Sequence, residues 1–93
     1  MVLEFEWDEN KAAENYAKHR VTFLAARAVF QDAFAIERAD DRFEYGEERF
    51  NIVGMAGNRL LSVIYSIRGG RIRIISARGA EPHEKRRYPE ENR

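Results

Sequence analysis

The sequence contains no cysteine and only two histidines. Without cysteine the chain forms neither disulfides nor a zinc-thiolate site, and two histidines are too few for a histidine-based metal cluster. No apolar run approaches the ~20 residues that a membrane-spanning helix needs, and there is no signal-peptide core. We therefore predict a cytoplasmic protein with no metal site, no cofactor and no membrane partner.

The length of 93 residues predicts one domain, residues 1–93, with a modest core. Hydrophobic residues make up 44% of the chain and charged residues 34%, as in a soluble protein with a heavily charged surface. The net charge of zero hides an asymmetry, because residues 1–58 carry seven Lys/Arg against twelve Asp/Glu, and residues 59–93 carry nine against four. Either this is chance, or the basic part of the chain contacts phosphate.

Hydrophobic periodicity predicts eight elements in the order β-α-α-β-β-β-β-α. They are Leu3–Trp7, Glu9–His19, Phe23–Gln31, Ala33–Ala39, Arg49–Met55, Arg59–Arg68, Arg71–Arg78 and Pro82–Asn92. The pattern predicts an α+β fold: a small, mostly antiparallel sheet with two N-terminal helices on one face and a short C-terminal helix.

Local signals support these boundaries. Asp8 and Thr22 are suitable N-caps for the first two helices, and Gly57-Asn58 and Gly69-Gly70 suit two-residue hairpin turns. The apolar stripe of the first helix is expected at Ala12, Ala13, Tyr16 and Ala17, and that of the second at Phe23, Ala26, Val29 and Phe30. The charged connection Asp40–Tyr45 is expected to be exposed and mobile.

The C-terminal helix is unusual because only Tyr88 provides an apolar contact. It is therefore either docked by a partner or frayed. Pro89 is expected to break the helix or end it early.

The strand Arg71–Arg78 has the clearest alternation in the chain and the densest ordered positive charge. A two-residue turn at Gly69-Gly70 places Ser66 opposite Arg73, Val63 opposite Ser76 and Leu61 opposite Arg78. The core face then carries Leu61, Val63, Tyr65, Ile67, Ile72 and Ile74, and Ala77 falls on the other, partly polar face. The open face carries Arg68, Arg71 and Arg73. Together with Lys85, Arg86 and Arg87 beside it, they are typical of a surface that binds RNA or another polyanion.

Several segments together resemble the BrnT family, the toxin half of a bacterial type II toxin-antitoxin pair. They are Phe5-Glu6-Trp7-Asp8, Lys11, Asn15, Lys18-His19, Val21, Phe23, Phe30, Asp32, Gly46-Glu47-Glu48-Arg49, Arg73-Ile74-Ile75-Ser76-Ala77-Arg78, Glu84 and Tyr88. The resemblance covers nearly the whole chain. The chain departs from the family at Arg20, where Gly is usual, and at Glu81, where a Thr N-cap is common.

The resemblance implies a fold similar to RelE-type ribonucleases and an endoribonuclease toxin that inhibits growth. It also implies a BrnA-type antitoxin with a ribbon-helix-helix fold that neutralises the toxin, with a two-toxin, two-antitoxin complex as the expected assembly. Operator DNA would then be bound only through the antitoxin.

RNA cleavage without a metal needs a group that accepts the proton of the ribose 2′-hydroxyl, a cation at the phosphate and a group that protonates the leaving oxygen. Arginine suits the phosphate because its planar fork binds two oxygens, and Arg49, Arg73 and Arg78 are the candidates. Strict alternation points Arg73 and Arg78 to opposite faces, so both serve one site only if a bulge or the strand end turns Arg78.

The predicted catalytic residues are Lys18, His19, Arg49 and Arg78, and the predicted RNA-binding residues are Arg68, Arg71, Arg73, Lys85 and Arg86. Histidine is the natural acid or base because its side chain ordinarily ionises near pH ~6.5. Each assignment has a structural alternative: His19 as a helix cap, Lys18 as a solvated side chain, Arg49 in a salt bridge with a neighbouring glutamate, and Arg78 held by Glu84. His83 is expected to be solvated and Tyr88 to anchor its helix.

Two other classes of function stay open. One is a non-catalytic binding module that acts as a co-repressor with a DNA-binding antitoxin. The other is a structural interaction protein whose basic C-terminal segment docks an acidic partner.

Overall fold

The computed structural model describes residues 2–41 and 46–91, with side chains up to residue 89. The elements are β1 (Phe5–Glu6), α1 (Glu9–His19), α2 (Phe23–Ala26), the 3-10 helix η1 (Arg27–Gln31), β2 (Ile36–Ala39), β3 (Phe50–Ala56), β4 (Arg59–Arg68), β5 (Arg71–Gly79) and α3 (Pro82–Glu91). The α+β class is therefore confirmed. Within the described part of the chain, no helix has both the length and the apolar character to cross a membrane.

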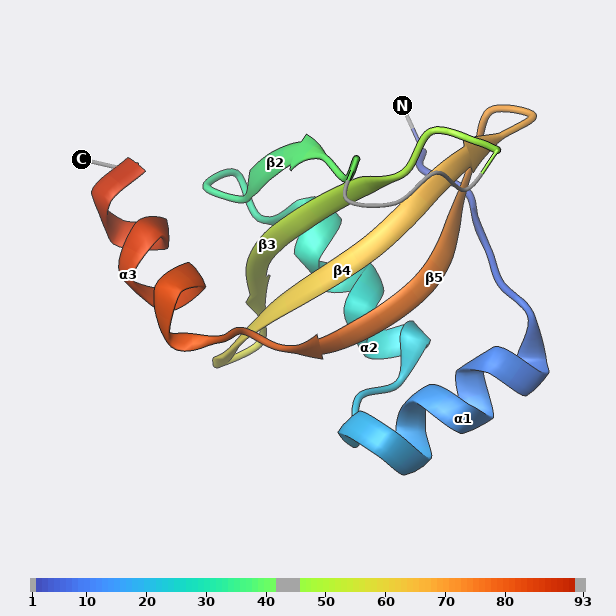
Figure 1. Cartoon of the computed structure of the whole chain (residues 1–93), viewed down its shortest axis with the longest axis horizontal. Coiled ribbons are helices and arrows are strands. Elements are labelled where there is room, and N and C mark those ends of the chain that lie inside the picture. Colours follow the sequence, from blue (N-terminus) through green and yellow to red (C-terminus); the bar gives the residue numbers. More distant parts are fainter. Residues whose placement is uncertain (1, 42–45, 92–93) are drawn as a thin grey trace.

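The five strands form one mixed sheet in the spatial order β1-β5-β4-β3-β2. Three neighbouring pairs are antiparallel, whereas β1 runs parallel to β5 and pairs with it at Ile72 and Arg73. Figure 1 shows α2 and η1 behind the sheet and α3 following the end of β5. The face opposite α2 and η1 is the one on which the polar side chains of the strands gather.

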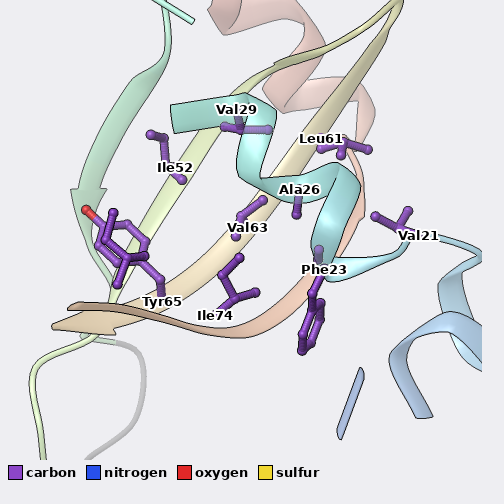
Figure 2. Packing of buried hydrophobic residues seen from close by; sticks show 11 residues of the cluster. Val21, Phe23, Ala26, Val29, Ile52, Leu61, Val63, Tyr65 and Ile74 are labelled. Carbon is purple, nitrogen blue, oxygen red and sulfur yellow. The ribbon is translucent and has the colours of Figure 1, made fainter. Parts of the chain in front are cut away.

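The core lies between this sheet and the helical segment of α2 and η1 (Figure 2). Phe23, Ala26 and Val29 are buried at helical spacing, as predicted, although the backbone tightens into η1 after Ala26. They pack against buried strand residues Ile52, Leu61, Val63, Tyr65, Ile72, Ile74 and Ala77. Burial of this apolar surface is the main source of stability for a domain of this size.

Helix α1 has the predicted bounds and ends. Asp8 accepts hydrogen bonds from the backbone N–H groups of Asn10 (2.8 Å) and Lys11 (3.1 Å). Arg20 ends the helix in the left-handed conformation, at φ 58°, which fits the position where the family usually has glycine. A non-glycine residue there costs about 1 kcal/mol.

The predicted apolar stripe of α1 is correct at Ala12, which is half-buried and packs against the core, and wrong at its other three positions. Ala13, Tyr16 and Ala17 are exposed, and the buried residue of the helix is Asn15. The reason is that α1 lies against β5, where it contacts the backbone of a strand edge, so an amide side chain is better suited there than an apolar one.

A bulge in β5 changes the predicted register. Ser66 lies opposite Arg73, as expected, but the pairing then shifts by one residue between Ile64 and Tyr65 of β4. From there on Val63 pairs with Ala77, Ser62 with Arg78 and Leu61 with Gly79, whereas the expected partners were Ser76 for Val63 and Arg78 for Leu61.

Because side chains alternate between the two faces, a shift of one residue moves every following side chain of β5 to the other face. Ala77 therefore enters the core, with 0% exposure, instead of lying on the open face. Arg78 lies opposite Ser62 and so shares the open face with Arg73, which lies opposite Ser66. The bulge thus removes the conflict between the two arginines.

The segment around β2 also differs from the predictions. The strand expected from Ala33 begins at Ile36, because the Asp32 carboxylate accepts a hydrogen bond from the backbone N–H of Phe34 (2.9 Å) and holds a turn. Asp40, expected to be exposed, is buried, and its backbone N–H donates to Arg49 O (2.8 Å). Residues 42–45 of that connection lie outside the described residues.

Helix α3 continues through Pro89 to Glu91, so the expected break is absent. A proline this close to a C-terminus removes one hydrogen bond from the last turn, which is a smaller loss than a proline in the middle of a long helix. Asn92, the predicted last residue, lies outside the described residues. The helix begins at Pro82. Glu81, at the position where the family commonly has a Thr cap, donates its backbone N–H to the side chain of Glu84 (2.8 Å).

Candidate functional site

A cleft of about 720 Å³ lies over the open face of the sheet. Its floor consists of two rows of side chains that cross β2, β3, β4 and β5: Ile36, Val53, Ser62 and Arg78 in one row, and Arg38, Asn51, Ile64 and Ser76 in the other. Its walls come from the end of α1 (Lys18, His19), from the last residue of β2 and the segment after it (Ala39, Asp40, Asp41), and from α3 with the residue before it (Glu81, His83, Glu84, Arg87). The cleft is therefore lined mainly by polar and charged groups.

Three of the four predicted catalytic residues, Lys18, His19 and Arg78, line this cleft. They come from the first helix and the last strand, so the fold brings together groups that are about 60 residues apart in sequence. Arg87, expected beside the open face, and His83, expected to be solvated, line the same cleft.

Asn15 fixes the end of α1 against β5. Its Nδ2 donates to Ala77 O (2.8 Å) and Val21 O (3.0 Å), and its Oδ1 accepts from Ala77 N (3.0 Å). The amide thus bonds the backbone of β5 as a neighbouring strand would, beyond the point where β1 pairs with it. His19 follows Asn15 by four residues and lies on the same side of the helix, which directs it to the cleft. Sequence reasoning missed this role, although an asparagine in a helix interior is a weak signal of one.

Arg78 is held by Glu84, as the structural alternative proposed. Its Nη1 donates to Glu84 Oε1 (2.8 Å), and its Nη2 donates to Glu84 Oε2 (3.2 Å). Ser62 Oγ also donates to Glu84 Oε2 (3.0 Å), and Asn51 Nδ2 donates to Ser62 Oγ (2.8 Å). This chain of contacts joins β3, β4, β5 and α3 beneath the cleft.

Burial would raise the pKa of the Glu84 carboxyl, but hydrogen bonds from Arg78, the Glu81 backbone and Ser62, with the charge of Arg78, outweigh it and lower that pKa. Glu84 is therefore a stable carboxylate at neutral pH. It orients the Arg78 guanidinium, whose side chain keeps 30% of its surface exposed.

A second polar contact holds the far end of α3. Tyr88 Oη donates to Asp32 Oδ2 (2.5 Å), and the same carboxylate accepts from the backbone N–H groups of Met55 (2.8 Å) and Phe34 (2.9 Å). Burial raises the pKa of Asp32, but these three hydrogen bonds outweigh it and leave the pKa below its ordinary value. Burial and the Asp32 carboxylate raise the pKa of Tyr88 to about 12. The helix that lacks an apolar stripe is thus docked within the monomer by polar contacts at Glu84 and Tyr88.

These contacts predict how stability depends on pH. Asp32 and Glu84 have lowered pKa values when folded, so their contribution is present above the ordinary values of 3.8 and 4.5 and is lost as pH falls through the folded values. Tyr88 has a raised pKa, so its contribution is present below pH 10 and is lost as pH rises towards about 12. Thermal melting is expected to show constant stability near neutral pH, with lower stability at acidic and at alkaline pH.

The Tyr88→Phe variant isolates the alkaline part. At pH 7 it is expected to lower the free energy of unfolding by about 1–2 kcal/mol, because a hydrogen bond to a carboxylate is lost. Because the variant has no phenol to ionise, it should lose less stability than the wild type between pH 10 and 12. Tyr16→Phe, at an exposed position of α1, is the matched control. Equal melting temperatures for the two variants at pH 7 would contradict the role of Tyr88.

Arg49, the fourth predicted catalytic residue, does not join the other three. It lines a separate pocket of about 110 Å³ with Lys11, Arg68 and Arg73, where Asp8 and Glu47 are the acidic members. Its Nε lies 3.8 Å from Glu47 Oε1, which agrees with the salt-bridge alternative.

The predicted RNA-binding arginines lie on the open face beside acidic residues from the first half of the chain. Arg68 pairs with Glu47 (3.3 Å), Arg71 with Glu4 (3.4 Å) and Arg73 with Glu6 (2.9 Å). Strand pairing thus brings arginines from the basic second part of the chain into contact with carboxylates from the acidic first part. The excess charges of the two parts therefore partly neutralise each other within the molecule. Lys85 and Arg86 are exposed on α3, outside the cleft lining.

Among the side chains that the structure describes, no three His, Cys, Asp or Glu residues are grouped so that they could hold a metal ion. A family model described as "Ribonuclease toxin, BrnT, of type II toxin-antitoxin system" matches residues 7–84. Comparison with curated proteins gave no match. The matched range runs from the residue after β1 to the first turn of α3 and contains Lys18, His19, Arg49 and Arg78.

Proposed function

Because the chain belongs to the BrnT family of ribonuclease toxins of type II toxin-antitoxin systems, we propose that it cuts RNA in the cleft between α1 and α3. The observation that carries this proposal is that Lys18, His19 and Arg78 line one cleft. These residues provide one group for proton transfer, a fork that binds phosphate and a further positive charge, and phosphodiester cleavage makes use of each of them.

The proposed reaction needs no metal ion. The ribose 2′-hydroxyl loses its proton as its oxygen bonds to the adjacent phosphorus, and the 5′-oxygen gains a proton as its bond to phosphorus breaks. His19 serves one of these two proton transfers. Arg78 binds the non-bridging oxygens, and Lys18 stabilises the charge that develops on them. The products are a 2′,3′-cyclic phosphate and a 5′-hydroxyl.

The ion pair with Glu84 bears on how Arg78 would bind a phosphate. Glu84 holds one side of the guanidinium through two hydrogen bonds, so the plane of the fork is set before the substrate arrives. The phosphate then contacts the exposed part of Arg78 or replaces Glu84 at one nitrogen. Glu84 is thus a positioning residue, and its lowered pKa makes it a poor general base.

The arginines outside the cleft are proposed to bind the RNA backbone. Arg49, Arg68 and Arg73 line the smaller pocket, and Arg71, Lys85 and Arg86 are exposed. Because each paired arginine must exchange a carboxylate for a phosphate, each contributes modestly, and their effect should fall as the salt concentration rises. The position of Arg49 outside the cleft favours this binding role over the catalytic role predicted from the sequence.

Membership of a type II toxin-antitoxin family implies an antitoxin partner. We propose that this partner is a BrnA-type protein with a ribbon-helix-helix fold, that the complex contains two toxins and two antitoxins, and that operator DNA is bound only through the antitoxin. The likeness to RelE-type ribonucleases, which the resemblance implies, belongs to the same proposal. The mass of the co-expressed complex in solution tests the stoichiometry.

The decisive test is incubation of the purified protein with a defined RNA in excess EDTA, followed by analysis of the fragment ends. Cleavage to 2′,3′-cyclic phosphate and 5′-hydroxyl ends, lost in His19→Ala and retained in Arg27→Ala, would support a metal-independent ribonuclease. Arg27 lies in η1, outside both pockets. A folded protein that neither cuts RNA nor arrests growth would instead favour the non-catalytic co-repressor.

A further inference from the structure

The chain has two histidines, one in α1 and one in α3, and both line the same cleft. His19 is the last residue of α1, and His83 lies in the first turn of α3. The elements that carry them lie at opposite ends of the sequence, so only the fold brings these two imidazoles to one cavity.

The placement of the two helices has a common origin in β5. The helix of His19 is held by Asn15, which bonds both backbone polar groups of Ala77. The helix of His83 is held by Glu84, the next residue along the chain, which forms the ion pair with Arg78. Because Ala77 and Arg78 are consecutive, both helices are anchored at the same point of the strand. The positions of both histidines are therefore set relative to the Arg78 guanidinium.

We propose that His83 is a second proton-transfer residue of this cleft and acts with His19 as an acid-base pair at the phosphate bound by Arg78. This inference rests on the proposed ribonuclease function and adds a catalytic residue to it.

The chemistry of the cut explains why two such groups are needed. The attacking 2′-oxygen and the leaving 5′-oxygen lie roughly in line on opposite sides of phosphorus, so one imidazole cannot reach both. One histidine takes the proton of the 2′-hydroxyl as the O2′–P bond forms. The other gives a proton to the 5′-oxygen as the P–O5′ bond breaks. One proton is taken and one is given, so the reaction needs no other reactant.

The two histidines share the cleft with eight other charged side chains. The cations that line it are Lys18, Arg38, Arg78 and Arg87, and the carboxylates are Asp40, Asp41, Glu81 and Glu84. Histidine is the side-chain type that ordinarily titrates between pH 5 and 8. A bell-shaped dependence of the cleavage rate on pH in this range would therefore report on the two histidines.

The test compares the pH dependence of kcat for the wild type, His19→Asn and His83→Asn, with melting temperatures to check the fold. Each variant is expected to lose about 100-fold or more at the wild-type optimum and to lose one limb of the bell, a different limb in each. His83 is exposed, so its replacement should not unfold the protein, and His83→Gln provides a second variant. Glu14→Gln, at an exposed position of α1 outside both pockets, is the matched control.

A substrate with a 5′-thio leaving group separates the two roles, because a thiolate departs without being protonated. It is expected to restore cleavage in the variant that lacks the acid and not in the other. Restored cleavage in one of the two histidine variants, and not in the other, supports the acid-base pair of His19 and His83. The inference is overturned if neither or both are restored, or if His83→Asn keeps the wild-type rate and both limbs. Absence of cleavage by the wild type would refute the proposed function itself, which is a distinct result.

Discussion

Replacing Arg78 with alanine is expected to lower the rate of RNA cleavage by at least about 100-fold. The variant loses the planar donor that stabilises the charge developing on the phosphate, a contribution typically worth 100- to 1,000-fold. It also leaves the buried Glu84 carboxylate without its cation, which should lower the free energy of unfolding by about 3 kcal/mol. Cleavage assays and thermal melting measure the two effects on the same protein.

Two further variants distinguish the chemical role of Arg78 from its role in holding α3. Arg78→Lys keeps the charge but loses the fork, so most of the rate loss should persist. Glu84→Gln weakens the ion pair but keeps the guanidinium, so stability should fall while the rate falls by less than about tenfold. Arg27→Ala controls for removal of an arginine elsewhere. A rate loss of equal size in Glu84→Gln and Arg78→Ala would mean that Arg78 acts only by positioning α3.

The Asn15→Ala variant is expected to lower the free energy of unfolding by about 2–4 kcal/mol. The change leaves Ala77 N–H and two carbonyls, those of Ala77 and Val21, without the partner they have in the interior. For a domain of this size each kcal/mol shifts the melting temperature by about 4–8 °C, so a drop of roughly 10 °C or more should be seen. Cleavage should fall as well, because α1 then no longer holds His19 at the cleft.

Asn10→Ala is the matched control for this prediction. Asn10 is an exposed residue in the first turn of the same helix, and its backbone N–H, which the substitution retains, donates to Asp8. Asn15→Asp tests the geometry, since it keeps an acceptor for Ala77 N but places a second acceptor against Ala77 O. It should be as destabilising as Asn15→Ala. Equal stability of the Asn10 and Asn15 variants would refute the anchoring role.

Features that depend on neighbours in sequence were predictable. The caps at Asp8 and Thr22, the helix end at Arg20 and the two glycine-containing turns all appear where expected, because each is a hydrogen bond or a backbone conformation within a few residues. The periodic burial of Phe23, Ala26 and Val29 also follows from local spacing. The apolar stripe predicted for α1 was mostly wrong because alanine is too small for its apolar character to require burial, and Ala13 is exposed.

The candidate site was only partly predictable. Residue type and the family resemblance singled out Lys18, His19 and Arg78, but they also singled out Arg49, which lies in another pocket. The pattern missed Asn15, because nothing local announces that the edge of β5 needs a hydrogen-bonding partner. It also passed over His83, since an exposed histidine in a polar helix looks solvated until the cleft beside it is known.

The alternation of side chains along the chain was enough to establish the α+β class, the sequence of helices and strands, and an open face rich in arginine. Which face Arg78 occupies was settled only when β4 and β5 paired with a one-residue bulge, because register is a property of two strands and not of one. The partners of the arginines were also settled by folding. Glu4, Glu6 and Glu47 are distant in sequence from the arginines of β4 and β5, and Coulomb attraction acts between charges only where the backbone brings them close.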